Sequence, residues 1–292
     1  MAVTVQQSLE RFVHQHYDRN RQAGHRAEHC VSLLIDYLQG WSGLLPPEWG
    51  GGEEGSQQEW ERELDAQMER MLGDADRSPP ADLGALTIDQ LDEEHLREFI
   101  GWYLLKDMAL DGRGIRNVLE MLRQWIDFAY RQRGLDRDRY HRFVAAFEEC
   151  APEGERAVVA AHALQRLVTS GALPVVGGRA RSPVVSLLAV AARLGIAEEG
   201  GGCTHWMRVD DVDAESLPLI LPPALHPYLR EGDVVQVTLA RLADGGVRLV
   251  ESGALFPASS WVDALVMEQY RPVDRVEQQE QGWESSEDDL LH

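Results

Sequence analysis

Apolar residues recur at helical spacing through the first 170 residues of the chain, and glycine or proline residues separate the successive stripes. The stripes cover residues 5–17, 27–41, 60–72, 96–104, 115–130, 140–147 and 158–168. Gly24 is expected to separate the first two helices, and Pro152 the last two. Stripes of this width can bury their apolar faces against one another. The pattern therefore predicts a helical bundle over residues 1–171, with an acidic insertion at 42–86.

The pattern changes beyond residue 171. Residues 172–202 are predicted to be a linker in which Pro183 starts one short helix. Strand-like apolar runs follow at 203–209, 217–223, 234–240, 247–252 and 253–257. The residues Asp-Gly-Gly at 244–246 are a hairpin signal between two of these runs. We therefore expect a small β-barrel or roll over 203–257, an α+β fold for the whole chain, and a disordered acidic tail at 258–292.

The charge balance is strongly acidic. Asp plus Glu total 49 and Lys plus Arg total 28, which gives a formal net charge of −21. Residues 48–95 alone carry 15 acidic residues against three arginines, a net charge of −12. A negative field of this size repels phosphate backbones and anionic lipids, so it favours a protein partner over DNA or a membrane. Lys106 is the only lysine, a bias that fits either a GC-rich genome, which we favour, or adaptation to high salt.

The cysteines and the apolar runs bear on the compartment. Cys30, Cys150 and Cys203 lie far apart and do not suggest a disulfide framework. The N-terminal residues lack the basic segment and apolar core of a signal peptide, and the longest nearly apolar run, 183–192, is too short to cross a bilayer. These features predict a cytoplasmic protein.

Two helical stretches carry a resemblance to a known family. LDEEHLREFIGWYLLKDM (91–108), a glycine break and IRNVLEMLRQWIDFAYRQRG (115–134) resemble the N-terminal SAM-like, or core-binding, domain of phage integrases and tyrosine recombinases. With FVHQHY (12–17) and CVSLLIDYL (30–38) as its earlier part, the resemblance spans residues 5–150. It implies a helical domain that clamps DNA. Because a β module and a tail are predicted where that family has its catalytic domain, it implies no recombinase activity.

An arginine-rich stretch at 113–142 is the main candidate for nucleic-acid binding. The candidate residues are Arg113, Arg116, Arg123, Arg131, Arg133, Arg137 and Arg139, and Arg142 lies close by. One interpretation is a face that contacts phosphates, as the recombinase resemblance implies. The favoured interpretation is a solvated helix face with mixed ion pairs, because the chain as a whole has the opposite charge from the one that phosphates need.

Residues suited to catalysis or metal binding give weaker signals. His25 and His29 have the i, i+4 spacing that can place two imidazoles on one metal ion. No third ligand has motif spacing, so histidines at the surface or the edge of the core are favoured. The glycine-rich runs at 50–52 and 200–202 are interpreted as linkers, and Glu148 and Glu149 would raise the pKa of a Cys150 thiol. We therefore predict no enzyme activity, no metal and no cofactor.

The predicted β module offers one further surface. Its aromatic and basic residues are His205, Trp206, Phe256, Arg208, Arg241 and Arg248. They raise the alternative of a platform for single-stranded nucleic acid, but core packing of Trp206 and Phe256 is favoured. The function predicted from the sequence is a non-catalytic binding or adaptor protein. The first alternative is a DNA-associated protein that uses the 113–142 arginines, and the second is a metal-dependent enzyme built on His25 and His29.

Overall fold

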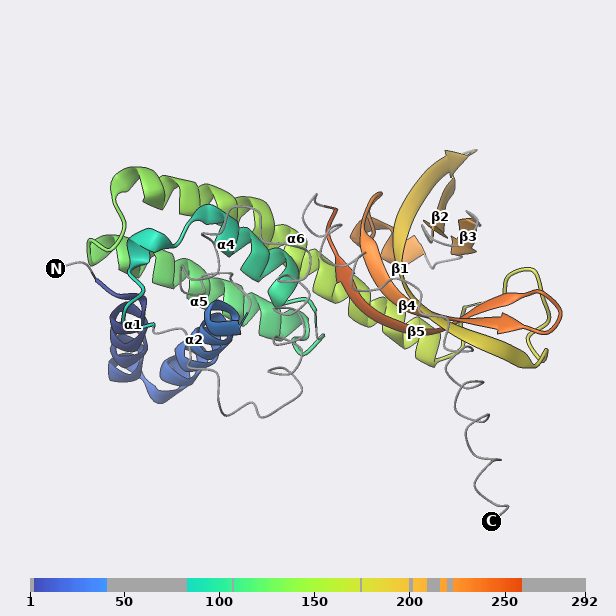
Figure 1. Cartoon of the computed structure of the whole chain (residues 1–292), viewed down its shortest axis with the longest axis horizontal. Coiled ribbons are helices and arrows are strands. Elements are labelled where there is room, and N and C mark those ends of the chain that lie inside the picture. Colours follow the sequence, from blue (N-terminus) through green and yellow to red (C-terminus); the bar gives the residue numbers. More distant parts are fainter. Residues whose placement is uncertain are drawn as a thin grey trace, which may run out of the picture. The chain divides into compact units, whose positions relative to one another are not determined.

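The computed structural model describes residues 3–40, 83–106, 108–173, 175–199, 202–208, 216–219 and 223–258 (Figure 1). These residues form a mixed α+β structure of helices followed by an antiparallel sheet. The helix predicted at 60–72, most of the acidic insertion and the acidic tail lie outside the described residues. The chain divides into two compact units. The first unit is 1–99 with 117–147, and the second unit is 100–116 with 148–292.

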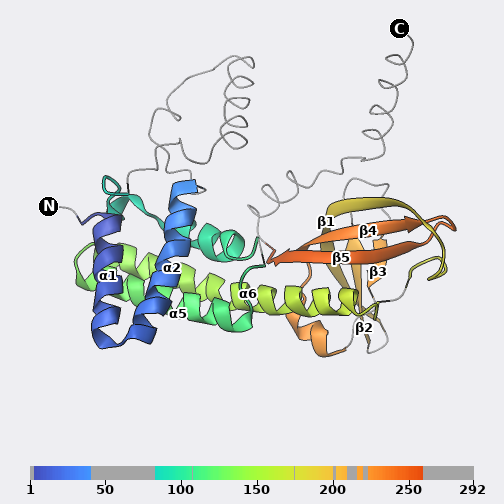
Figure 2. The ribbon, with the colours of Figure 1, turned by 90° about the horizontal axis from the view of Figure 1, so that it is seen from below.

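The first unit is helical. It contains α1 (Val5–Arg19), α2 (Arg21–Gly40), α4 (Glu93–Glu98) and parts of α5 (Gly112–Arg131) and α6 (Arg137–Thr169). Helices α1 and α2 lie side by side in both views (Figures 1 and 2). Asn20 separates them, and its Oδ1 accepts the amide of Ala23 at 2.8 Å. The break predicted at Gly24 is therefore wrong. Gly24 lies inside α2, where the Tyr17 ring occupies the space that a Cβ would need.

A buried apolar core joins the helices of the first unit, as the helical stripes predict. Phe12 meets Phe128 edge to face, with ring centroids 5.6 Å apart, and Tyr37 lies 5.4 Å from Phe99. Full burial of a side chain such as Phe12, which is 1% exposed, stabilises the fold by about 1.5–3 kcal/mol. One buried polar group is satisfied within this core, because the indole N–H of Trp125 donates to Ser8 Oγ at 3.2 Å.

The stripe at 96–104 is divided between two helix types. A single 3₁₀ turn, η2 (Ile88–Gln90), comes first, and α4 follows it. Asp92 caps α4, because its Oδ1 accepts the amides of Glu94 and His95 at 3.1 Å each. A π-helical turn, η3 (Phe99–Tyr103), continues from α4.

Helix α6 corrects the prediction of two helices separated by Pro152. It runs unbroken for 33 residues with Pro152 inside it. A proline in a helix lacks only its own N–H, so the cost is one backbone hydrogen bond and a local clash. Buried residues continue on both sides of it, from Phe143 and Ala146 to Ala157 and Leu164. Their packing outweighs the local penalty.

The second unit carries an antiparallel sheet. Its strands are β1 (Val184–Glu199), β2 (Gly202–Arg208), β3 (Ser216–Leu219), β4 (Val234–Leu242) and β5 (Val247–Phe256), and a 3₁₀ helix, η4 (Pro223–Tyr228), precedes β4. The strand order β3-β2-β1-β4-β5 is that of an open sheet, so the barrel or roll stays a prediction. The predicted hairpin is confirmed: β4 pairs with β5, and Gly245 has a φ of +85° in the turn. Figure 2 shows the C-terminal half of α6 running alongside β4 and β5.

Strand β1 corrects the predicted linker. The short helix expected after Pro183 is instead a strand of 16 residues. Its first part pairs with β4 over Val184–Arg193, and its last part pairs with β2 over Arg193–Glu199. Alanine, leucine and arginine in this segment suit a helix, but these two partners satisfy the backbone of β1 along different parts of its length. The segment 253–257, expected as a separate strand, forms the end of β5.

Candidate binding surfaces

A buried ionic cluster joins α6 to the start of β4 inside the second unit. Arg156 donates two hydrogen bonds to the carboxylate of Asp233, at 2.7 and 2.8 Å, and a third to the carbonyl oxygen of Tyr228 at 2.7 Å. Glu153 bridges Arg156 and Arg230, at 3.0 and 2.5 Å. Burial opposes the charged guanidinium, but Asp233 and Glu153 outweigh it and raise the pKa of Arg156. We call these four charged residues, Glu153, Arg156, Arg230 and Asp233, the clasp.

The clasp is structural rather than catalytic. Both oxygens of Asp233 accept hydrogen bonds from Arg156, and one of them also accepts the Arg230 amide at 2.8 Å. Asp233 is 1% exposed and therefore meets no substrate. Sequence reasoning missed the clasp because Arg156 and Asp233 are 77 residues apart and belong to no local motif.

The predicted arginine face is distributed over both units. Arg113 and Arg116 belong to the second unit, and the other five candidates belong to the first. Arg116 donates to the Gly112 carbonyl oxygen at 2.7 Å and lies 3.3 Å from Glu155. Arg123 forms an ion pair with Asp127, which also accepts the hydroxyl of Tyr140. These arginines hold local structure, as the interpretation of mixed ion pairs predicts.

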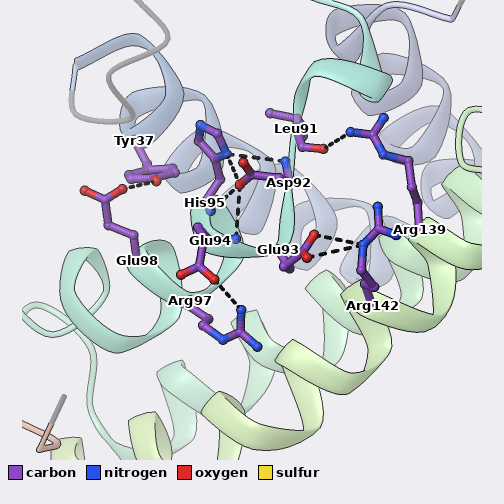
Figure 3. Close-up of polar contacts among 10 residues, drawn as sticks. All are labelled: Tyr37, Leu91, Asp92, Glu93, Glu94, His95, Arg97, Glu98, Arg139 and Arg142. Atoms are coloured by element: carbon purple, nitrogen blue, oxygen red, sulfur yellow. Dashed lines mark hydrogen bonds and ion pairs between the residues drawn. The ribbon is translucent and has the colours of Figure 1, made fainter. Parts of the chain in front are cut away.

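Arg139 and Arg142 hold α4 against α6 within the first unit (Figure 3). Arg139 Nη2 donates to the Leu91 carbonyl oxygen at 3.1 Å, and Arg142 Nε lies 3.2 Å from Glu93. Arg131, Arg133 and Arg137 are exposed near the turn between α5 and α6. Their side chains make no hydrogen bond or ion pair with the described part of the chain. Of the predicted candidates, these three and Arg113 are the ones whose guanidinium has no partner among the described residues.

A histidine–carboxylate pair, His95 and Asp92, lies at the start of α4. His95 Nδ1 is 2.5 Å from Asp92 Oδ1, and Tyr37 donates to Glu98 at 2.7 Å (Figure 3). Burial tends to raise the pKa of Asp92, but the hydrogen bonds from His95 lower it overall. An aspartate that orients a histidine is a familiar acid–base arrangement, but no described serine or cysteine is hydrogen-bonded to this one. The pair serves to cap α4, and the i, i+3 spacing of Asp92 and His95 was its sequence signal.

The structure does not bring His25 and His29 together on a metal site. His25 Nδ1 lies 3.0 Å from the Tyr17 hydroxyl and 3.3 Å from Glu28, while Nε2 accepts from Arg21 at 3.3 Å. Among the described residues, no group of three or more His, Cys, Asp or Glu side chains is arranged to hold a metal ion. Cys30 is also inert within the core, because burial raises the pKa of its thiol to about 12.

An open groove runs between α1 and α2 in the first unit. Its volume is about 720 Å³. Its lining is apolar at Leu9, Val13, Val31, Ile35 and Leu83 and polar at Gln6, Glu10, His14, Tyr17 and Gln39. The groove has the mixed lining of a surface that accepts an apolar side chain, and its described lining residues include no hydrogen-bonded pair of acid and base suited to catalysis.

The first residues of β1 form a sheet edge that no other described strand covers on one side. Within the described residues, 184–192 pair with β4 alone, since the pairing of β1 with β2 begins at Arg193. The amide and carbonyl of Leu194 both bond toward the start of β4, to Asp233 and Gly232. Because these groups alternate direction along a strand, those of Leu187 and Ala189 point away from β4. We call residues 184–189 the open edge.

The open edge is apolar and exposed. Val184, Val185 and Leu187 are 45%, 67% and 55% exposed, and they are the only large hydrophobic residues on the described part of the sheet with such exposure. A β-bulge at Val184/Ser186 interrupts the pairing with β4 at its start. Exposed edge strands commonly carry charges that prevent pairing with other chains, and this one has none between residues 184 and 189. Sequence reasoning missed it because this segment was assigned to a helix.

Four arginines lie in the loop before the open edge and on strands β4 and β5. Arg179 and Arg181 lie in the loop that leads into it, Arg241 pairs with Ser186 across the sheet, and Arg248 pairs with Ala240. Arg179, Arg181 and Arg241 are exposed, and none of the four side chains has a partner among the described residues. Phe256, by contrast, is fully buried, as the core interpretation of the β module predicts, while the side chains of His205, Trp206 and Arg208 are outside the described residues.

Comparisons with known proteins add no relative. A scan against protein-family models, a search of curated proteins and a search of solved structures each found no match. The recombinase resemblance at residues 5–150 therefore stays a prediction. Among the helices that the structure describes, none combines the length and apolar character that crossing a membrane requires.

Proposed function

We propose that this chain is a non-catalytic binding or adaptor protein that holds a protein partner at the open edge of β1. The observation that supports it is the combination of outward-pointing backbone groups at Leu187 and Ala189 with exposed apolar side chains on the same six residues. An extended segment of a partner can satisfy those backbone groups by adding a strand to the sheet, and its side chains can cover Val185 and Leu187.

The proposal fits the energetics of sheet edges. Hydrogen bonds in strand addition supply affinity, and burial of apolar side chains supplies roughly 25 cal/mol for each Å² removed from water. A monomer gains nothing from leaving three large apolar side chains in water beside backbone groups that have no partner among the described residues. The open edge is therefore better explained by a binding role than by a structural one.

A blocking substitution tests this function. Leu187→Pro removes one outward amide without touching the bonds to β4, because proline is tolerated where the N–H of an edge strand faces away from its neighbour. Partners captured from the native host by the full chain, in the presence of nuclease, are expected to be lost from Leu187→Pro and kept by Leu187→Val. Thermal unfolding confirms that each variant is folded. Leu187→Lys, which keeps the amide and removes the apolar contact, is the second blocking variant.

The outcome that contradicts this function is equally clear. If folded Leu187→Pro and Leu187→Lys both retain the partners of the unsubstituted chain, the open edge is not the binding surface.

A second candidate function is association with DNA. It is favoured by Arg131, Arg133 and Arg137, whose exposed side chains have no described partner. Under this alternative the chain shifts a duplex in a gel, the affinity falls steeply as salt rises, and Arg131→Glu with Arg133→Glu abolishes the shift. Arg179→Glu with Arg181→Glu, which makes the same charge change in the other unit, serves as the control. A shift that survives the first double substitution excludes this face.

A further inference from the structure

We infer that the partner segment at the open edge is an extended, acidic peptide whose alternate residues are apolar, added to the sheet beside β1. This inference rests on the proposed function and specifies the chemistry of its partner. The open edge offers backbone groups and apolar side chains, and the residues around it offer positive charge. A ligand that satisfies all three is a strand with acidic and apolar residues in alternation.

The charge around the open edge is opposite to that of the whole chain. Residues 176–189 and 238–251 contain four arginines and two acidic residues, a net charge of +2, while the chain carries −21. Both acidic residues are already engaged. Asp244 accepts the amides of Arg179 and Gly246, at 2.7 and 3.2 Å, and Glu251 accepts the Thr238 hydroxyl at 2.8 Å. An acidic segment is therefore repelled by most of the molecule and attracted here.

The arginines are placed on both faces of the sheet. Cross-strand pairing puts Arg241 in one row with Ser186, and puts Arg248 in the neighbouring row with Ala240 and Leu187. Adjacent rows project their side chains to opposite faces. Strands lie about 4.8 Å apart, so a strand added beyond β1 lies about 10 Å from β4, toward which the long Arg241 side chain can reach, and about 14 Å from β5, where Arg248 adds only to the local positive field. An added peptide therefore meets the Arg241 side chain on one face of the sheet and only the more distant charge of Arg248 on the other.

The loop that carries Arg179 and Arg181 is held in position. Gly178 lies against Gly246 so closely that a Cβ built on Gly178 would come within 2.6 Å of the Gly246 Cα. Val176 pairs with Val247 through two backbone bonds of 2.9 Å, and the Asp244 carboxylate holds the amide of Arg179. Hydrogen bonds from the amides of Arg179 and Gly246, that of Arg179 foremost, hold the pKa of Asp244 below its usual range. Both arginines therefore start from a fixed backbone beside the open edge.

A peptide fits these features better than a nucleic acid does. Positive charge alone would suit either one. Outward amide and carbonyl groups in strand geometry bind another peptide backbone, whereas phosphates accept hydrogen bonds and cannot donate to the outward carbonyls. Val184, Val185 and Leu187 offer aliphatic contact rather than the aromatic surfaces on which bases stack.

Fluorescence anisotropy with the full chain tests the inference. The probes are labelled peptides of equal length in which valine alternates with glutamate, valine alternates with lysine, or proline alternates with glutamate, together with an oligothymidine of matching charge. The valine–glutamate peptide is expected to bind, and its affinity to fall as NaCl rises. Arg179→Glu with Arg181→Glu is expected to weaken it by roughly tenfold or more, while the matched Arg131→Glu with Arg133→Glu leaves it unchanged.

Each failure points to a different conclusion. Equal binding of the valine–lysine peptide, stronger binding of the oligothymidine, or no binding of any probe overturns the acidic partner. Binding of the proline–glutamate peptide as tight as that of the valine–glutamate peptide overturns strand addition. If Leu187→Pro loses the partner captured from the host while Arg179→Glu with Arg181→Glu keeps it, the protein-binding function stands and this inference fails. If Leu187→Pro keeps that partner, both fail.

Discussion

Arg156 and Asp233 form an ion pair that is buried on both sides, with side-chain exposures of 8% and 1%. Asp233→Asn keeps the shape of the side chain and removes its charge, so the Arg156 guanidinium stays buried with only Glu153 to balance it. Removing one partner of a buried pair costs about 3–5 kcal/mol. We expect urea unfolding at neutral pH to show a loss of this order in the free energy of unfolding.

The outer half of the clasp supplies the control for that substitution. Arg230 is 59% exposed and contacts Glu153. Because solvent screens exposed pairs, Arg230→Gln is expected to cost less than about 1 kcal/mol. Similar losses for Asp233→Asn and Arg230→Gln would show that burial of the inner pair contributes little to stability.

His16 makes the stability of the first unit depend on pH. It is 4% exposed and lies edge-on to Phe12. Burial, and then the charges of Arg19 and Arg26, lower its pKa below the usual 6.5. The unfolded chain therefore binds a proton more readily. The contribution of His16 is complete above about pH 6.5 and is lost as pH falls toward the lowered pKa of the folded state.

His16→Leu removes this titration and keeps an apolar side chain against Phe12. We expect the free energy of unfolding of the unsubstituted chain to fall more steeply than that of His16→Leu between pH 7.5 and mildly acidic pH. Urea titrations at several pH values measure both slopes. Parallel slopes for the two proteins would show that the folded and unfolded chains bind the His16 proton equally well.

At the scale of elements, local patterns predicted α1, α2, α5 and the β4–β5 hairpin. In each, the apolar period agrees with the packing observed, although the boundary between α1 and α2 lies at Asn20 and not at Gly24. The predictions failed where distant partners decide the outcome. Local rules predict that Pro152 ends a helix, yet α6 continues past it because residues on both sides of it are buried. Residues 184–199 have the composition of a helix and become a strand between β2 and β4.

The candidate binding surfaces also depend on distant partners that local patterns do not reveal. Arginine spacing along 113–142 suggested one face, but Arg139 and Arg142 bind Leu91 and Glu93, which lie about 50 residues earlier in the chain. No local pattern reveals such pairs. The open edge was hidden for the same reason, since it depends on β2 pairing with the second part of β1, so that no described strand covers residues 184–189 on that side.

Residues 176–178 pack closely against the β4–β5 turn. This contact gives a prediction at the scale of elements. Gly178→Ala places a methyl group within 2.6 Å of the Gly246 Cα, a backbone atom that cannot rotate away. The strain of such overpacking is about 1–3 kcal/mol. We expect Gly178→Ala to lower the unfolding temperature and to weaken binding at the open edge.

Gly40→Ala is the matched control, because no described atom lies within 4 Å of a Cβ at Gly40 and alanine is the better helix former. Equal unfolding temperatures for Gly178→Ala and the unsubstituted chain would mean that the two segments separate without cost.

At the scale of the whole molecule, the dominant feature is 49 acidic residues against 28 basic ones. Self-repulsion of a net charge of −21 destabilises the compact state more than the unfolded chain, in which the charges lie farther apart. Salt reduces the screening length from about 10 Å at 0.1 M to about 3 Å at 1 M, so it should remove most of this repulsion. A gain of about 1–2 kcal/mol, or roughly 3–6 °C in unfolding temperature, is expected between low salt and 1 M NaCl. Exposed ion pairs among the described residues, such as Arg116–Glu155, are weakened by the same screening but contribute less than the net charge.

Scanning calorimetry in sodium chloride and in sodium thiocyanate separates screening from effects of the anion. At low concentrations the two salts should stabilise the chain equally, because screening depends on ionic strength alone, and they should diverge only at high concentrations. An unfolding temperature that falls from the first addition of salt would mean that attractive pairs outweigh the acidic excess. Salt would then lower both the stability of the fold and the affinity of acidic peptides for the open edge. The expected result is the opposite: salt stabilises the fold while it weakens the acidic partner, so a single salt titration that follows unfolding and peptide anisotropy together distinguishes the two contributions.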